Sequence, residues 1–282
     1  MAGSDQAIIQ KMLDKFYPEL NDPSSTLYLP KLIQSKGYDP DSVGNLPVGS
    51  LPANGGTSGA QQICAAVAPF GEAAIPTPGV EPSIDLTDVS IAGLSNVKVD
   101  RPIAGGSDGR TITATAEFLK LASPLPQQIV GKGNFTLKQQ CCIAETKTTC
   151  KKGVAPLNET GKGTFTFTIT GGTAQVVLCI SKLAKDVLTL EAKSVEFKPT
   201  LPFKITVDIT SAPEKARQGF NNLAEGVLDT DKAQTAIMTQ FNAVLNSEGR
   251  LDGFAKQLTE QLDDYLRDNH LYPFNGGFAS LF

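Results

Sequence analysis

The residues of this chain that could carry out catalysis or bind a metal are five cysteines, one histidine and a pair of adjacent aspartates. Serine and cysteine hydrolases need a histidine base beside the nucleophile, and His270 is the single histidine. Neither the zinc-protease pattern His-Glu-x-x-His nor a dinucleotide-binding fingerprint occurs. Asp263 and Asp264 are adjacent in sequence, and adjacent side chains on a helix do not face each other. We therefore expect that the protein is not an enzyme.

The cysteines are Cys64, the cluster Cys141, Cys142 and Cys150, and Cys179. The cluster matches no common zinc-ligand spacing and has no nearby histidine, so we expect no metal and no other cofactor. A disulfide from Cys150 to Cys141 or Cys142 would require an oxidising compartment. Free thiols of a cytoplasmic protein are the favoured interpretation, and an odd count leaves at least one cysteine unpaired in either case.

Targeting signals and membrane spans are not evident in the sequence. Residues 1–6 lack a basic stretch followed by an apolar core, so no signal peptide is expected, and no run of about 18 apolar residues occurs. The cytoplasm is therefore the expected location, with secretion as the alternative if the N-terminus was processed or replaced. The net charge of −4 and the pI of about 5.2 predict no nucleic-acid partner.

Runs of alternating polar and apolar residues lie between residues 163 and 209. Their apolar members are Phe165, Phe167 and Ile169; Ala174, Val176, Leu178 and Ile180; Leu188, Leu190 and Ala192; and Phe203, Ile205, Val207 and Ile209. A period of two over short runs predicts antiparallel strands with one apolar face and one solvated face. Gly171-Gly172 predicts a hairpin turn between the first two runs. Upstream, the apolar face changes between Leu86 and Val89, which predicts a β-bulge.

The first 82 residues begin with a helical pattern and continue as a segment rich in proline and glycine. Ser4 is a candidate cap for a helix whose apolar stripe ends at Phe16, and Tyr17-Pro18 is expected to end this helix. This helix has only two basic residues, Lys11 and Lys15, which is few for a helix that binds a membrane surface. Packing on the body of the protein is therefore favoured, with membrane contact as the alternative. Residues 46–59 have the composition of an extended linker, and residues 60–70 are compatible with either a helix or a strand.

Helical periodicity returns after Ser211. Ser211 and Glu214 have the spacing of a capping box, and a second helix is expected to start at Asp229-Thr230-Asp231. The run Leu251–Leu266 repeats apolar residues at helical spacing and is the strongest amphipathic segment of the chain. We expect it to form a helix whose apolar stripe faces the sheet.

The order of these elements, one helix followed by strands and then helices, predicts an α+β fold. We expect a highly curved antiparallel sheet wrapped around a long C-terminal helix, with an N-terminal helix beside them. The expected segments are residues 1–82, with the N-terminal helix and the extended Gly/Pro-rich stretch, and residues 83–282, with the sheet and the closing helix. We expect the two segments to form one continuous domain.

Two segments resemble the tubular lipid-binding (TULIP) superfamily. Residues 84–94, Ile-Asp-Leu-Thr-Asp-Val-Ser-Ile-Ala-Gly-Leu, are similar to the early strand that ends in Gly-Leu in the takeout and group 7 mite allergen branches. The run Leu251–Leu266 resembles the closing helix of these proteins. Bacterial relatives from neurotoxin gene clusters belong to the same superfamily. The resemblance covers residues 83–282 and implies a TULIP-like lipid-binding protein without catalytic activity.

The apolar face of the sheet and the apolar stripe of the helix suggest an elongated groove for a lipid or another apolar molecule. The residues expected to bind it are Phe165, Phe167, Ile169, Val176, Leu178, Leu190, Phe203, Ile205, Val207, Leu258 and Leu262. The same side chains could instead fill a dry core. The alternative function is a scaffold or assembly protein that binds a protein partner or forms a homo-oligomer. Its contacts would use the threonine-rich face or the polar hairpin 143–162, and transient membrane contact is a further alternative.

Overall fold

The computed structural model describes residues 2–268, apart from residues 36, 51–56, 101–103, 107–109, 123, 185, 186 and 248. His270 therefore lies outside the described residues. The helices are α1 (Ala2–Asn21), α2 (Leu29–Ser35), α3 (Thr57–Val67), α4 (Arg217–Leu228), α5 (Asp231–Leu245) and α6 (Arg250–Asp268), with a 3₁₀ helix, η2 (Glu214–Ala216). The strands are β1 (Asp41–Ser50), β2 (Ala74–Pro76), β3 (Ser83–Ala92), β4 (Val97–Val99), β5 (Ala104–Gly105), β6 (Thr111–Phe118), β7 (Ile129–Ile143), β8 (Leu157–Ile169), β9 (Gly172–Ala184), β10 (Val187–Pro199) and β11 (Lys204–Ser211).

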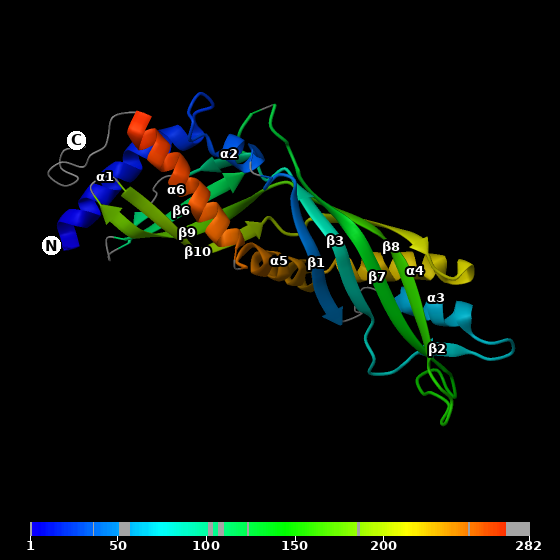
Figure 1. Ribbon diagram of the computed structural model, residues 1–282. Helices are drawn as coiled ribbons and strands as arrows, with labels where there is room; N and C mark the ends of the chain where they lie inside the picture. The colour runs from blue at the N-terminus through cyan, green and yellow to red at the C-terminus, as the bar shows by residue number, and fades with distance from the viewer. Residues whose placement is uncertain are drawn as a thin grey trace.

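The strands form two antiparallel sheets. The first sheet has the order β1-β3-β7-β8-β11, with β2 also paired to β7, and the second has the order β10-β9-β6-β4, with β5 also paired to β6. Figure 1 shows the two sheets at opposite ends of the molecule, with α5 between them. Helices α3 and α4 lie with the first sheet, and α1, α2 and α6 lie with the second. The predicted α+β architecture, with antiparallel strands and a C-terminal helix, is confirmed.

Gly171-Gly172 does not form the expected hairpin. Ile169, at the end of β8, pairs with β7, whereas Gly172, at the start of β9, pairs with Pro199 of β10 and Phe118 of β6. The two glycines therefore carry the chain from the first sheet to the second. A Cβ atom on Gly172 would lie 2.7 Å from the backbone oxygen of Lys198, so glycine is needed here for a close approach of two backbones.

The bulge predicted in β3 is confirmed. The pairing register between β3 and β7 shifts between Thr87 and Ser90, and Asp88 has a φ of 53°. The extra residue reverses the alternation, so Leu86 and Val89 are both buried.

The segment before residue 83 contains more regular structure than its composition suggested. Residues expected to be an extended linker include the second half of β1, which pairs with β3, and the start of α3. The expected end of the first helix at Tyr17-Pro18 was wrong, because α1 continues through Pro18 to Asn21. The burial of Leu13 and Phe16 agrees with the expected packing on the body of the protein.

The two cap predictions near the C-terminal helices had different outcomes. Thr230 caps α5, because its side-chain oxygen accepts a hydrogen bond from the Ala233 amide at 3.2 Å. The capping box at Ser211 was wrong: Ser211 is the last residue of β11, and neither η2 nor α4 has a side-chain cap. Ser211 is paired with Lys162 of β8, so its backbone is still extended where the box would require a helix start.

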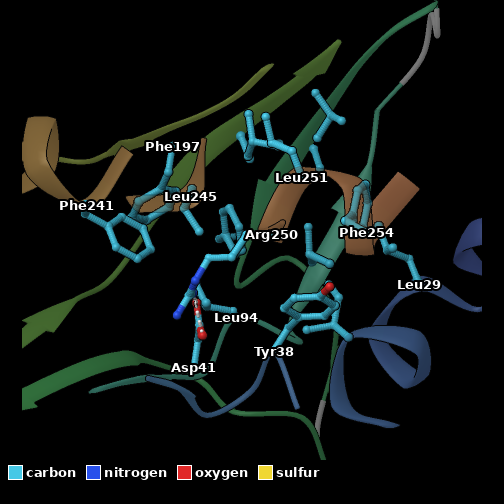
Figure 2. Close-up of a pocket in the computed structure, with 17 residues that line it drawn as sticks. Leu29, Tyr38, Asp41, Leu94, Phe197, Phe241, Leu245, Arg250, Leu251 and Phe254 are labelled. Atoms are coloured by element: carbon cyan, nitrogen blue, oxygen red, sulfur yellow. Dashed lines mark hydrogen bonds and ion pairs between the residues drawn. The ribbon is translucent and has the colours of Figure 1, made fainter. Parts of the chain in front are cut away.

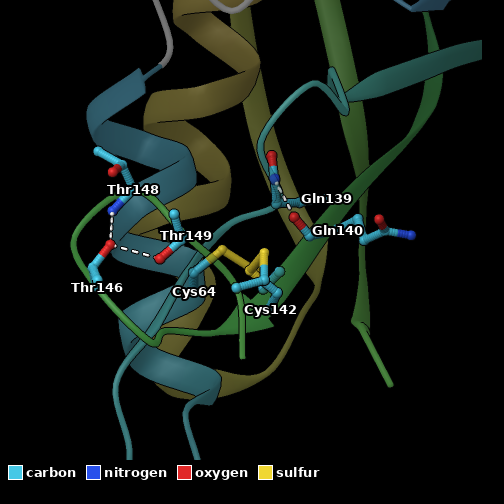
Figure 3. Close-up of a disulfide and its surroundings, with 9 residues drawn as sticks. Cys64, Gln139, Gln140, Cys142, Thr146, Thr148 and Thr149 are labelled. Carbon is cyan, nitrogen blue, oxygen red and sulfur yellow. Dashed lines mark hydrogen bonds between the residues drawn. A yellow bond between two sulfur atoms is a disulfide. The ribbon is translucent and has the colours of Figure 1, made fainter. Parts of the chain in front are cut away.

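Two disulfides correct the prediction of free thiols (Figure 3). Cys64 of α3 is bonded to Cys141 of β7, and Cys142 is bonded to Cys150 in the loop after β7. Cys179 is the free cysteine, in agreement with the odd count. The Cys64–Cys141 pair could not be predicted because 77 positions separate its members. Within the described part of the chain, no helix is long and apolar enough to cross a membrane.

Candidate functional site

The second sheet and the helices that cover it enclose two neighbouring apolar cavities. The first, which we call the ion-pair cavity, has a volume of about 160 Å³ and lies between β4, β6, β9 and β10 and helices α2, α5 and α6 (Figure 2). It is lined by Leu29, Ile33, Tyr38, Asp41, Leu94, Val97, Ala116, Phe118, Ala174, Val176, Val195, Phe197, Phe241, Leu245, Arg250, Leu251 and Phe254.

The second, which we call the α1 cavity, has a volume of about 110 Å³. It is lined by Leu13, Phe16, Leu20, Leu29, Val99, Ile112, Ala114, Ala116, Val176, Leu178, Leu190, Phe254, Leu258 and Leu262, all of them apolar. Leu29, Ala116, Val176 and Phe254 contribute to both linings and therefore form the wall that the two cavities share.

The size of these cavities limits what they can hold. An apolar cavity of about 150 Å³ admits a molecule as large as benzene, whereas pockets for larger ligands have volumes of about 300–1,000 Å³. Each cavity by itself therefore fits a small ring or a short chain. A longer chain must occupy both and must displace side chains of the shared wall.

Helix α6 supplies one side of the site through its amphipathic pattern. Phe254, Leu258 and Leu262 are spaced four residues apart, so they lie on one face of the helix, and all three line the α1 cavity. On the opposite side, Val176 and Leu178 alternate along β9 and point from the sheet into the same space. The apolar side chains of the helix and the sheet thus meet across the cavity.

Amide side chains pair with the free edge of β10, on the side of the sheet next to α5. Asn242 accepts a hydrogen bond from the Phe197 amide at 2.8 Å and donates one to the Phe197 carbonyl at 3.0 Å. Asn246 likewise accepts a hydrogen bond from the Val195 amide at 2.9 Å and donates one to the Val195 carbonyl at 2.6 Å. An edge strand otherwise leaves backbone groups unpaired, so α5 takes the place of a neighbouring strand.

Two further side-chain amides make the same kind of two-point contact with a backbone. Gln234 accepts from the Phe203 amide at 3.0 Å and donates to its carbonyl at 2.9 Å. Asn21 of α1 forms the same two-point contact with Val99 on the opposite edge strand, β4, at 3.0 Å for each bond. Both edges of the second sheet are therefore paired by side chains of the covering helices.

One end of the ion-pair cavity carries charge. The Arg250 Nη1 atom donates to both carboxylate oxygens of Asp41, at 2.8 and 2.7 Å, and Nη2 donates to the Ser42 carbonyl. Asp41 is buried, and Tyr38 lines the same cavity with its hydroxyl pointing away from Asp41, toward Phe254 (Figure 2). Burial raises the pKa of Tyr38, the Asp41 carboxylate raises it further, and the Arg250 cation lowers it. Tyr38 therefore remains a neutral phenol around neutral pH.

The eleven residues expected to bind a ligand fall into two places in the structure. Val176, Leu178, Leu190, Leu258 and Leu262 line the α1 cavity. Four others are buried with the first sheet: Phe165, Phe167, Ile169 and Phe203. The centroid of the Phe167 ring there lies 6.2 Å from that of Phe165 and 5.4 Å from that of Phe203. Ile205 and Val207 are half-buried on β11. The sequence pattern grouped these residues because both sheets have the same alternation.

Several lining residues were not predicted. Phe118 ends an alternating run of β6, and Phe254 belongs to the stripe of α6, so both had a recognisable signal in the sequence. Asp41 and Arg250 had none, because 209 positions separate them and nothing in their local patterns indicates a contact.

The described residues contain no cluster of possible metal ligands. No group of three or more histidine, cysteine, aspartate or glutamate side chains there could hold a metal ion. Residues 105–109 read Gly-Gly-Ser-Asp-Gly, the spacing of a nucleophile elbow. That motif requires a turn from a strand into a helix. The described residues on either side belong to the antiparallel strands β5 and β6, and residues 107–109 lie outside the described part of the chain.

No protein-family model and no curated protein sequence matches the chain. Among solved structures, Takeout 1 of Epiphyas postvittana is 13% identical with a TM-score of 0.34, over 93% of this chain and 90% of that chain. Lipopolysaccharide binding protein is 14% identical with a TM-score of 0.32, over 81% of this chain and 42% of that chain. Latherin is 12% identical with a TM-score of 0.21, over 94% of this chain and 93% of that chain. These values are low, so the function must be argued from the cavities themselves.

Proposed function

We propose that the protein is a non-catalytic carrier of a lipid or another apolar molecule, which binds between the second sheet and helices α1, α2 and α6. The observation that carries this proposal is the pair of adjacent cavities with almost entirely apolar linings. A ligand chain gains about 0.8 kcal/mol for each methylene group that it buries. The proposed ligand contacts are Val176, Leu178, Leu190, Leu258 and Leu262, together with Phe254 of the shared wall.

The proposal includes membership of the TULIP superfamily. It is supported by antiparallel sheets covered by helices, an N-terminal helix and a closing amphipathic helix, which is the arrangement that the resemblance implied. We further propose that residues 1–82 and 83–282 fold as one unit, because β1 pairs with β3 and α3 is bonded to β7 through Cys64–Cys141. The two disulfides also support folding in an oxidising compartment.

The direct test is to extract the purified protein with organic solvent and identify the released molecules by mass spectrometry. Binding is then measured with N-phenyl-1-naphthylamine, a neutral dye that fluoresces in apolar sites. The proposal expects a co-purified lipid, or saturable dye binding that lipids reverse. Protein that releases no lipid and binds no dye would contradict it.

Leu258→Trp locates the site. In a cavity, the larger side chain occupies ligand space, so dye affinity should fall at least about tenfold, whereas the melting temperature of the ligand-free protein should change little. In a dry core, the same change would overpack and destabilise the protein by about 1–3 kcal/mol. Leu201→Trp is the matched control, because Leu201 is 41% exposed and the natural chain has no tryptophan. Equal dye binding by both variants would contradict the proposed location.

A second candidate function is a scaffold or assembly protein. The observation that favours it is Phe70, a fully exposed aromatic residue in the loop between α3 and β2. Exposed aromatic side chains are enriched at the centres of protein interfaces. Sedimentation of the wild type beside Phe70→Ser separates the two functions, since a stable assembly that this change dissociates would favour the scaffold.

A further inference from the structure

We infer that the ligand is an uncharged lipid, such as an alcohol or an ester, and that Asp41 excludes fatty-acid anions from the site. This inference rests on the proposed carrier function and goes further by naming the chemical class of the ligand. The observation that carries it is the ion pair at the end of the ion-pair cavity, where the cation already has a buried counterion (Figure 2).

The Arg250 guanidinium is the group that would attract a carboxylate, and it is already engaged. Its Nη1 atom is shared by both Asp41 oxygens, and its Nη2 atom donates to the Ser42 carbonyl. Asp41 is fixed by the pairing of β1 with Ile91 of β3, and its side chain is only 8% exposed. Asp41 therefore occupies the position that the head group of a fatty acid would need.

No second cation lines either cavity in the part of the chain that the structure describes. Asp41 and Arg250 are the only charged residues among those that line the two cavities, and their charges cancel. A carboxylate brought into the ion-pair cavity would place two anions beside one guanidinium, in surroundings of low polarity. Like charges that share a site disfavour ionisation, and an unpaired carboxylate is costly to transfer from water to an apolar site.

An uncharged polar group, in contrast, has a partner. Tyr38 lines the same cavity, and its hydroxyl makes no hydrogen bond to any residue that the structure describes. Its ring packs edge-on against Phe254 of the shared wall, with 6.4 Å between ring centroids. The Tyr38 hydroxyl points toward Phe254 (Figure 2). A hydroxyl or ester oxygen of a ligand beside Phe254 can therefore exchange a hydrogen bond with Tyr38, while the rest of the chain extends toward the α1 cavity.

The test compares three ligands with the same chain: lauryl alcohol, methyl laurate and laurate, at a pH where laurate is ionised. Each is titrated into the full-length protein loaded with N-phenyl-1-naphthylamine. Like-charge contacts cost several kcal/mol, so wild type should bind laurate at least about tenfold more weakly than either neutral ligand. Tyr38→Phe should weaken the alcohol and the ester by a few-fold to about tenfold, because one hydrogen bond is lost, and leave laurate unchanged.

Asp41→Asn keeps the shape of the side chain and removes its charge. Arg250 then lacks a counterion, so laurate affinity should rise at least about tenfold while lauryl alcohol binds as before. Asp252→Asn is the matched control, because Asp252 is an exposed residue of the same helix that borders an outer groove and neither cavity. The control should keep the wild-type ratio of the two affinities.

The outcomes separate this inference from the carrier function on which it rests. If the wild type binds laurate as tightly as lauryl alcohol, the inference is overturned while the carrier function stands, and this comparison needs no variant to fold. If Asp41→Asn and Asp252→Asn raise laurate affinity equally, overall charge and not Asp41 sets the selectivity. If neither the dye nor any of the three ligands binds, the carrier function itself has failed.

Discussion

Phe167 lies directly over the backbone of Gly131 on the neighbouring strand. A Cβ atom on Gly131 would be 2.0 Å from the Phe167 ring, and one on Gly133 would be 3.0 Å from the ring of Phe165. The absence of these side chains gives the two rings space to stack. Glycine inside a strand otherwise weakens a sheet and often marks such a close approach.

Gly131→Ala should therefore destabilise the protein. The new methyl group would overlap the Phe167 ring, and overpacking of this kind costs about 1–3 kcal/mol in the free energy of unfolding. Urea unfolding measures the change, with Lys132→Ala as the control because Lys132 is the adjacent, exposed residue of the same strand. A Gly131→Ala variant as stable as the control would show that the ring is not confined by this strand.

At the scale of single residues, the sequence predicts which face of a strand a side chain occupies but not which distant residue it contacts. The alternation correctly placed Phe165, Phe167 and Ile169 on a buried face. It could not show that the two rings lie over glycines of β7, or that Asp41 meets Arg250, because these contacts join distant positions. The pair to which we assign ligand selectivity, Asp41 and Arg250, is therefore one that local patterns do not reveal.

At the scale of elements, side-chain amides at the C-terminal end of α5 form the hydrogen bonds that a further strand would otherwise make to the edge of β10. Asn242 and Asn246 lie one helical turn apart and each pairs with both backbone groups of one residue of β10. Phe197, which Asn242 holds in this way, lines the ion-pair cavity. The wall of the site thus depends on hydrogen bonds that a helix makes to a strand edge.

Asn242→Leu should open this edge locally. The substitution leaves the Phe197 amide and carbonyl without partners, and each unpaired buried group costs about 1–3 kcal/mol. Hydrogen exchange of the Phe197 amide should accelerate together with the loss of stability. Thr239→Ala is the control, since its hydroxyl bonds only to the carbonyl of Thr235 within α5. Unchanged exchange at Phe197 would mean that the amide contact does not hold the edge.

Element types were more predictable than element partners. The strand runs and the amphipathic helix α6 were recognisable from their periods of two and 3.6 residues. Their partners were not, because β8 and β9 have the same alternation yet belong to different sheets. Strand β1 was missed since its sequence, Asp-Ser-Val-Gly-Asn-Leu-Pro-Val-Gly-Ser, has the composition of a loop, and only pairing with β3 makes it a strand.

At the scale of the whole molecule, the two sheets have different interiors. The first sheet packs on α3 and α4 around large buried side chains such as Phe135 and Phe220, and the Cys64–Cys141 bond crosses this packing. The second sheet and its covering helices contain both of the apolar cavities described above. We expect the first end to provide stability and the second to exchange ligand. The predicted helix-and-sheet groove corresponds to the second end alone.

Phe254 is the residue where this division can be tested, because it belongs to the wall between the cavities. Phe254→Ala should join them into one longer space, so the ligand preference should move toward longer chains, as measured by dye displacement with a series of fatty alcohols. The stability cost should be below the roughly 3–5 kcal/mol typical of truncating a buried phenylalanine, since Phe254 is half-buried and already faces empty space.

Phe220→Ala makes the same truncation at the other end of the molecule. Phe220 is fully buried, and a Cβ on Gly161 would come within 2.5 Å of its ring, so no space adjoins it there. This variant should lose the full amount of stability and keep the wild-type preference for chain length, because it leaves both cavities unchanged. If instead Phe254→Ala loses as much stability as Phe220→Ala and shows no change in chain-length preference, Phe254 does not separate two parts of one binding site.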